Sequence, residues 1–337
     1  MKRPLEEFSR LRRCLALTAL LGATLSAAPT HAEDAAKDWP SKPIRLVVGY
    51  PPGGANDQMA RQLAPRLGKA LGASIVVENR AGADGVIGTT FVAQQPPDGY
   101  TLALAGMSPL VLSAFTFSHV PYDAHKDLVG ASTVASSPML FAVSPSLPVK
   151  TFQDLVAYAK AHPGKLNFAT AGSGGSTRVM LELFKQTTGA DVHYISYKGA
   201  SQGLTDLLGG RLDAMIIDFS VLYPLVQQGK LRALATSGAH RSPLLPDVPT
   251  VTELGYPKLA AGNWYAVVAP AGTPAPIMDK LNKAVVQIAN SEDMTKAFAG
   301  MSVEAMTQTN RADFGRFLQS EFDRWGHVIQ AAGIKAE

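Results

Sequence analysis

The stretch IRLVVGYPPGGANDQMARQL, residues 44–63, has the pattern of a strand, a glycine turn and the start of a helix. The apolar run ending at Val48 indicates a buried strand, and Met59, Leu63 and Leu67 recur at the spacing of one helix face. Backbone N–H groups in such a turn point at one spot, where the helix dipole adds positive potential. The stretch AGSGGSTR, residues 171–178, repeats the arrangement. Two such turns facing one cleft suit a ligand with an acidic group at each end.

Residues 1–32 have the features of an export signal rather than of folded structure. A basic start is followed by the apolar run CLALTALLGATLSAA and by THA, a cleavage-like site ending at Ala32. The apolar run is shorter than the ~20 residues of a membrane-spanning helix. The pair Arg12 and Arg13 leaves a twin-arginine signal open as an alternative to the general export route. The expected mature protein is therefore periplasmic.

Removal of residues 1–32 leaves 26 basic and 25 acidic residues, so the expected mature chain is nearly neutral. A neutral chain argues against a nucleic-acid partner. The single cysteine, Cys14, falls within the signal, which excludes disulfides, thiolate metal sites and cysteine catalysis from the mature chain. HExxH does not occur, and six scattered histidines remain. We expect neither a metal nor a cofactor.

Short apolar runs alternate with amphipathic ones from Ile44 onward, which is typical of an α/β protein. Predicted strands include SIVVEN, YTLALAG, a run from Met139 and LNFATAG; predicted helices include Pro274–Asn290 and Arg311–Ala332, and Pro65 is expected to kink the first helix. The similar layouts of residues 139–155 and 264–281 indicate two passes between lobes. We expect lobe 1 at 33–142 and 266–337, and lobe 2 at 143–265.

Two sequence patterns, the P-loop and GxSxG, would indicate an enzyme rather than a binding protein. The first turn lacks the Gly-Lys-Ser/Thr of a P-loop, and Asn56 and Asp57 stand there instead. Residues 199–203 fit the nucleophile pattern GxSxG, with Ser201 between a predicted strand and helix and with aspartates and histidines downstream. Because an HGGG-type oxyanion segment is not visible, hydrolysis at Ser201 stays a minor alternative. We therefore expect that the protein is not an enzyme.

Several side chains have both a binding and a structural interpretation. Arg178 is placed to reach an anion at the second turn, or to pair with Glu182 one helical turn away. Trp264 is expected at the return strand, where it lines the cleft or fills the core. Tyr197 and Lys198 end a predicted strand, the usual place of ligand sites in α/β folds.

The chain resembles the Bug family, the extracytoplasmic solute receptors of tripartite tricarboxylate transporters. The resemblance covers nearly the whole mature chain in order, including WPSKPIRLVVGYPPGGANDQMAR, VVENRAGADGVIGTTFVAQQPPDGYTL, HPGKLNFATAGSGGSTRVMLELFKQTTG, YKGASQGLTDLLGGRLDAM and WYAVVAPAGTPAPIMDKLN. It implies a type II periplasmic binding protein: two α/β lobes joined by two crossover strands, with a ligand cleft between them. The implied partners are a small carboxylate and the large and small membrane subunits of a permease, and we expect a monomer.

The resemblance also assigns ligand-binding positions to both glycine loops. The first loop is Pro52, Gly53, Gly54, Ala55, Asn56 and Asp57, the second is Gly172, Ser173, Gly174, Gly175, Ser176 and Thr177, and the turn at Tyr197, Lys198 and Gly199 follows. In that setting Ser201 is a turn residue.

Two departures from the family pattern concern the substrate. Arg178 stands where relatives commonly have histidine, and the segment MIIDFSVLYP around Asp218 also differs. Dicarboxylates, tricarboxylates, acidic amino acids and aromatic acids all remain open, as does a sensory role in place of transport.

Overall fold

The computed structural model describes residues 38–335, so the predicted signal at residues 1–32 lies outside the described residues. The account below concerns the unit that begins at Pro40. Its strands are β1 (Ile44–Val48), β2 (Ile75–Asn79), β3 (Thr101–Gly106), β4 (Leu128–Val143), β5 (Asn167–Thr170), β6 (His193–Ser196), β7 (Ala214–Asp218), β8 (Arg232–Thr236), β9 (Gly262–Pro270) and β10 (Glu304–Ala305).

The helices alternate with these strands along most of the chain, as the sequence predicts. They are α3 (Ala55–Leu71), α4 (Val86–Ala93), α5 (Ser113–Thr116), α6 (Phe152–Ala161), α7 (Ser176–Thr188), α8 (Ala200–Leu208), α9 (Phe219–Gln227), α10 (Ala275–Ala289), α11 (Glu292–Ala299) and α12 (Arg311–Ala332). Three short turns, η1 (Ala83–Gly85), η2 (Ser108–Leu112) and η3 (Pro257–Leu259), complete the described elements.

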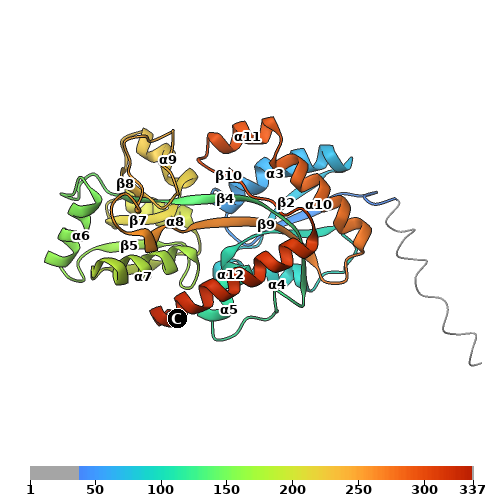
Figure 1. Cartoon of the computed structure of the whole chain (residues 1–337), viewed down its shortest axis with the longest axis horizontal. Coiled ribbons are helices and arrows are strands. Elements are labelled where there is room, and N and C mark those ends of the chain that lie inside the picture. Colours follow the sequence, from blue (N-terminus) through green and yellow to red (C-terminus); the bar gives the residue numbers. More distant parts are fainter. Residues whose placement is uncertain (1–37, 336–337) are drawn as a thin grey trace, which may run out of the picture. The chain divides into compact units, whose positions relative to one another are not determined.

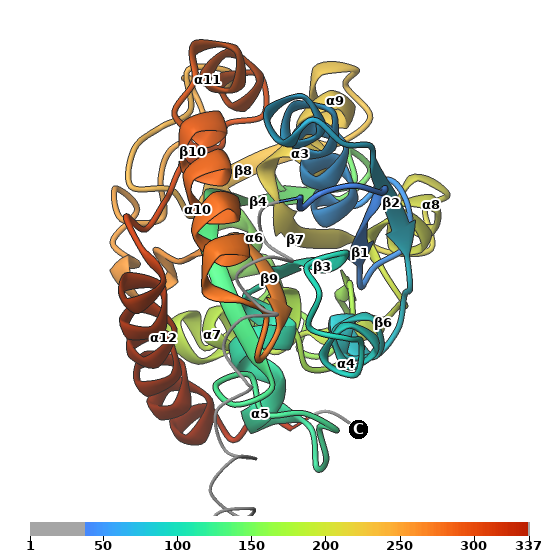
Figure 2. The same cartoon turned by 90° about the vertical axis from the view of Figure 1, so that its right-hand side faces the viewer.

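The sheet order is β2-β1-β3-β9-β4-β7-β5-β6, with β8 and β10 also paired to β4 (Figure 2). Strands β1, β2 and β3 are parallel to one another, as are β5, β6 and β7. The two parallel groups are thus separated in the sheet by β9 and β4, which gives one lobe around β1–β3 and another around β5–β7.

Strands β4 and β9 connect the two lobes (Figure 1). Up to Pro138, β4 pairs antiparallel with β9, and from Met139 to Val143 it pairs with β7 and β8. Pro138 lies opposite Gly262, so β4 changes partners at the position where the sequence predicts the first crossing. The lobe boundaries at residues 142–143 and 265–266 remain predictions.

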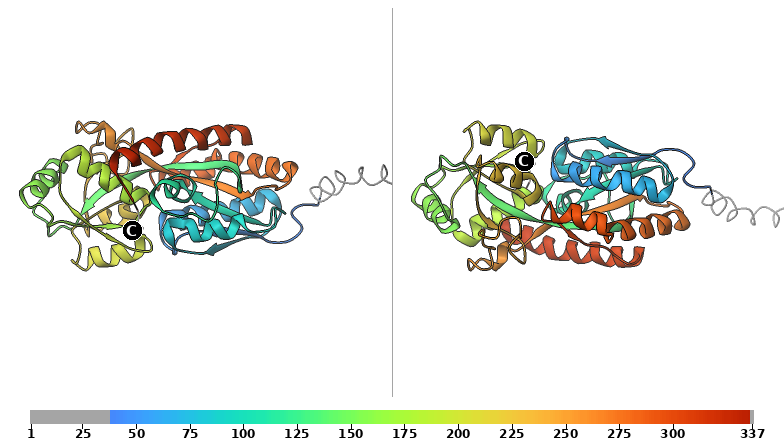
Figure 3. Two further views of the ribbon diagram at one scale, coloured as in Figure 1. Left: turned by 90° about the horizontal axis from the view of Figure 1, so that it is seen from below. Right: turned by 90° about the horizontal axis from the view of Figure 1, so that it is seen from above.

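The C-terminal helices contact elements of the lobe that holds the N-terminal strands. Helix α10 contacts α3 and β4, and α12 contacts β4 and η2 (Figure 3). Glu321 on α12 is buried and accepts hydrogen bonds from the indole nitrogens of Trp264 at 2.8 Å and Trp325 at 3.1 Å. This carboxylate ties the last helix to the return strand β9.

The structure differs from the prediction at the start of the strand around Met139. Strand β4 begins at Leu128, eleven residues before the apolar run that indicated it. Its first half is rich in small residues, so that helices pack closely: Gly130 lies against Phe314, and Asn282 of α10 donates to the carbonyl of Ala131 at 2.7 Å. Helix α3 continues through Pro65 from Ala55 to Leu71. Packing of its buried face against the sheet outweighs the one backbone donor that Pro65 lacks.

Candidate functional site

The first glycine loop joins β1 to α3, and Gly54 is the residue before the helix begins. Gly53 has a φ of 86°, a conformation that favours glycine. The carboxylate of Asp57 accepts hydrogen bonds from the N–H of Gly53 at 3.0 Å, from Asn79 at 2.9 Å and from Arg61 at 2.8 Å. Burial raises the pKa of Asp57, but these hydrogen bonds outweigh it, and the pKa falls below 3.8. Asp57 therefore fixes the loop from within.

The second glycine loop joins β5 to α7 in the other lobe. Gly175 precedes the helix, and the hydroxyl of Thr177 accepts a hydrogen bond from the N–H of Ala171 at 2.9 Å. The N–H of Ser176 donates to the hydroxyl of Ser108, which belongs to η2 in the first lobe, at 3.0 Å. The two loops thus lie on opposite lobes, and a direct hydrogen bond joins the second loop to the first lobe.

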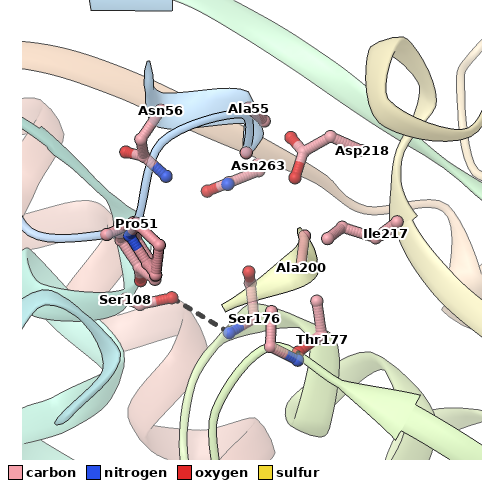
Figure 4. Close-up of a pocket in the computed structure, with 13 residues that line it drawn as sticks. Pro51, Ala55, Asn56, Ser108, Ser176, Thr177, Ala200, Ile217, Asp218 and Asn263 are labelled. Atoms are coloured by element: carbon pink, nitrogen blue, oxygen red, sulfur yellow. Dashed lines mark hydrogen bonds between the residues drawn. The ribbon is translucent and has the colours of Figure 1, made fainter. Parts of the chain in front are cut away.

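A cavity lies between the N-terminal ends of α3 and α7 (Figure 4). The first lobe contributes Asn56, the second lobe contributes Ser176 and Asp218, and β9 contributes Asn263. In Figure 4 these four side chains point toward the same space. Asn56 is buried, and its amide oxygen has no hydrogen-bond partner. In Figure 4 the amide nitrogen of Asn56 points into the cavity, so its N–H groups are available as donors to a molecule there. The cavity is lined by Tyr50, Pro51, Gly54, Ala55, Asn56, Ser108, Ala171, Ser176, Thr177, Ala200, Ile217, Asp218 and Asn263.

The lining contains amides, hydroxyls, backbone groups and one carboxyl group, that of Asp218, and it contains no lysine or arginine. Burial raises the pKa of Asp218, although Tyr265, Ser137 and Asn263 hydrogen bond to it. The phenol of Tyr265 donates to this carboxylate, and burial together with Asp218 raises the pKa of Tyr265 well above 10.0. Compensation of an acidic ligand would therefore come from neutral donors and the two helix N-termini.

Six of the predicted site residues line this cavity: Gly54, Ala55, Asn56, Ser176, Thr177 and Asp218. Pro52, Gly53, Gly172, Ser173, Gly174 and Gly175 belong to the loops around it without lining it. Lys198 is exposed, and Tyr197 donates to Asp206 at 2.7 Å. The structure does not bring these last two side chains to the cavity lining.

Arg178 and Trp264 also lie outside the cavity lining. The guanidinium of Arg178 pairs with Glu182 at 2.9 Å and stacks on the ring of Tyr194 at 3.5 Å. The pairing with Glu182 is the second of the two interpretations of Arg178 that the sequence left open. Trp264 is buried and faces α12, while its neighbours Asn263 and Tyr265 face Asp218. Adjacent strand residues point to opposite sides, so Trp264 could not share a face with Tyr265.

Seven lining residues were not predicted from the sequence: Tyr50, Pro51, Ser108, Ala171, Ala200, Ile217 and Asn263. Pro51, Ala171, Ala200 and Ile217 are direct neighbours of predicted positions and Tyr50 is two residues away, so a wider window around each position would have included them. Ser108 and Asn263 belong to other elements and are brought near only by the fold. Ser201, the alternative nucleophile, donates its hydroxyl to the carbonyl of Pro52 at 3.0 Å, and its proton is used in a contact between lobes.

A family model described as the tripartite tricarboxylate transporter family receptor matches residues 59–334. The chain belongs to this family. The receptor is 38% identical to protein BugT of Bordetella pertussis over 320 residues, which cover 95% of this chain and 98% of that protein. The predicted resemblance to the Bug family is thereby confirmed.

Solved structures similar to the receptor agree with its fold. A protein of R. palustris with adipate is 34% identical with a TM-score of 0.85, covering 88% of this chain and 99% of that one. The periplasmic binding protein BugD is 29% identical with a TM-score of 0.83, covering 89% and 100%. MatC of Rhodopseudomonas palustris, with bound malate, is 29% identical with a TM-score of 0.81, covering 86% and 100%. The prediction of two α/β lobes of the type II periplasmic binding protein fold is confirmed.

Within residues 38–335, none of the helices combines the length and the apolar character that crossing a membrane requires. In the same range, no three histidine, cysteine, aspartate or glutamate side chains are grouped so as to hold a metal ion.

Proposed function

We propose that this receptor captures a small carboxylate in the periplasm and delivers it to the membrane subunits of a tripartite tricarboxylate-type permease. The observation that carries the proposal is the cavity between the N-terminal ends of α3 and α7, one from each lobe, with the amide nitrogen of Asn56 pointing into it. Helix N-termini favour anions because their first N–H groups lack partners. The adipate and malate in the R. palustris structures support the same ligand class.

The proposed mechanism is capture by closure. With the lobes apart, an acid binds the donors of one loop; the second loop then completes its contacts, so that the liganded receptor is closed. Each charge-assisted hydrogen bond contributes about 1.5–3 kcal/mol. Four or five such bonds, less several kcal/mol for lost ligand freedom, leave roughly the −8 kcal/mol of micromolar binding. The proposed lobes are 33–142 with 266–337, and 143–265.

Binding is tested by thermal shift and calorimetry with a series of dicarboxylates that includes adipate and malate. We expect saturable one-to-one binding of at least one acid, which proton NMR recovers unchanged after incubation. Chemical conversion of the acid, or the absence of binding across dicarboxylates, tricarboxylates, acidic amino acids and aromatic acids, would contradict the proposal.

The position of the acid is tested with Asn56→Asp, which preserves the shape of the side chain but adds a carboxylate facing the cavity. We expect at least about a tenfold loss of affinity, because like charges at short range repel and the amide donor is lost. Asn310→Asp is the matched control: Asn310 is exposed, and its side chain caps α12 as an acceptor, a role that aspartate retains. Equal affinities of the two variants would place the acid elsewhere.

A further inference from the structure

The segment Gly82–Gly85, which includes η1, has an unusual backbone conformation. Its four residues have φ angles of 143°, 46°, 52° and 91°, and two of them, Ala83 and Asp84, are not glycine. Positive φ occurs in only a few per cent of non-glycine residues. The phenol of Tyr50 donates to the carbonyl of Asp84 at 2.8 Å and fixes this conformation from the first loop. The conformation directs the side chain of Asp84 out of its own lobe.

The carboxylate of Asp84 lies in the second glycine loop. Its Oδ2 atom accepts a hydrogen bond from the N–H of Gly174 at 2.9 Å, and the N–H groups of Ser173 and Gly175 lie close enough to favour its charge. The side chain is 5% exposed. These backbone N–H groups belong to the loop to which the family resemblance assigns ligand binding.

Two glycines of this loop leave the space that the carboxylate fills. A Cβ atom on Gly172 would lie 1.5 Å from Oδ1 of Asp84, and one on Gly175 would lie 2.5 Å from the same atom. The loop and Asp84 are thus complementary in shape. An external carboxylate cannot occupy the same donors while Asp84 remains there.

The contact also bridges the lobes, because Asp84 precedes β3 and the loop follows β5. It acts beside two other bridging hydrogen bonds, from Ser176 to Ser108 and from Ser201 to Pro52. These three hydrogen bonds join the two lobes, so the lobes are closed on each other in the described conformation.

We propose that Asp84 is a built-in occupant of the second glycine loop: in the ligand-free receptor it holds the lobes closed, and an incoming acid must displace it. The second half of this inference rests on the proposed function, whereas the first half concerns the protein alone. Asp84 would then set both the resting conformation and the affinity, since every ligand competes with a tethered carboxylate.

The contact is tested on the full chain by electron–electron resonance between spin labels. The labels are attached at Val76→Cys in β2 and Leu208→Cys in α8, both exposed, in a Cys14→Ser background. Asp84→Gly removes the carboxylate but accepts the positive φ without strain. Without ligand, we expect the closed-to-open ratio to fall about tenfold or more, as for the loss of a charge-assisted hydrogen bond.

Ala83→Gly is the matched control, because it adds the same backbone freedom at a neighbouring positive φ and keeps the carboxylate. We expect Ala83→Gly to give the same distances between the spin labels as the receptor that retains Ala83. Asp84→Asn preserves an acceptor oxygen and serves as a second variant if Asp84→Gly melts with reduced cooperativity. Identical distance distributions in the receptor, Asp84→Gly and Asp84→Asn, or an open ligand-free receptor, would overturn the inference.

Displacement is tested by measuring the affinity of the same variants for adipate and malate. We expect Asp84→Gly to bind the preferred acid more tightly, by about the factor by which its closed ligand-free form has decreased. Weaker binding by Asp84→Gly would overturn displacement and show that Asp84 supports the liganded form instead. If no variant binds either acid or any other carboxylate, the proposed function fails. The spin-label distances still test whether the contact of Asp84 holds the lobes closed.

Discussion

Lowering the pH is expected to close the ligand-free receptor, and the cause lies in Asp84. Burial raises the pKa of this carboxyl group from 3.8 to about 6, although the N–H groups of Gly174, Gly175 and Ser173 favour its charge. When the lobes part, Asp84 becomes hydrated and its pKa returns toward 3.8. The closed form therefore binds the proton more tightly. Its added stability is complete below pH 3.8 and is lost as the pH rises through about 6.

The magnitude follows from these two pKa values. Between pH 7 and pH 5, the closed-to-open ratio should rise about ninefold, equivalent to about 1.3 kcal/mol, toward a limit of about 3 kcal/mol in stronger acid. Two other titratable groups face this region. Burial, followed by Asp84, raises the pKa of Tyr50 well above 10.0, so Tyr50 stays neutral throughout. Asp218 also has a raised pKa, and its contribution has to be separated by experiment.

The separation uses Asp84→Asn and the spin-label pair at Val76 and Leu208, measured without ligand from pH 7 to pH 5. We expect the short-distance population to increase in the receptor and to stay constant in Asp84→Asn, in which Asp218 is unchanged. A pH response of equal size in both proteins would assign the proton to another group and refute the reasoning. A shift toward longer distances in acid would refute its sign.

Three further predictions concern packing and closure. Glu321→Ala should destabilise the fold by about 1–3 kcal/mol for each stranded indole N–H, and Glu321→Gln by much less, as measured by urea denaturation. Gly130→Ala should cost about 1–3 kcal/mol, because its Cβ would lie 2.1 Å from the ring of Phe314, and Phe314→Leu in the same chain should restore part of this loss. Gly199→Ala should leave urea stability unchanged but lengthen the spin-label distance, because its Cβ would lie 2.6 Å from Pro51 of the other lobe.

The alternation of elements and the positions of both loops were predictable because local rules determine them. Apolar strands, amphipathic helices and caps such as Thr151, which forms a capping box with Asp154, are set by neighbours in sequence. The beginning of β4 was missed because small residues give no apolar signal. They are placed in a strand by pairing with β9 and by close packing of Phe314 and Asn282.

The site was predicted in part, and Asp84 was missed altogether. Its signal in the sequence is an acidic residue within the glycine-rich run AGADGVIG, but nothing local shows that its carboxylate crosses to a loop ninety residues further along the chain. The sequence left Trp264 either at the cleft or in the core, and strand alternation could not decide between them until the fold showed that Asn263 lines the cavity. Trp264 then faces the opposite side of the sheet.

The pairing of Pro138 with Gly262 has a mechanical consequence. Proline has no N–H to donate and glycine adds no side chain, so the ladder between β4 and β9 ends at a weak pair, beyond which β4 pairs with β7 and β8 instead. Bending should concentrate at this pair, and the two lobes would rotate as rigid bodies about a single hinge. A membrane partner that contacts both lobes would then need to distinguish only two angles between the lobes, whatever molecule the receptor carries.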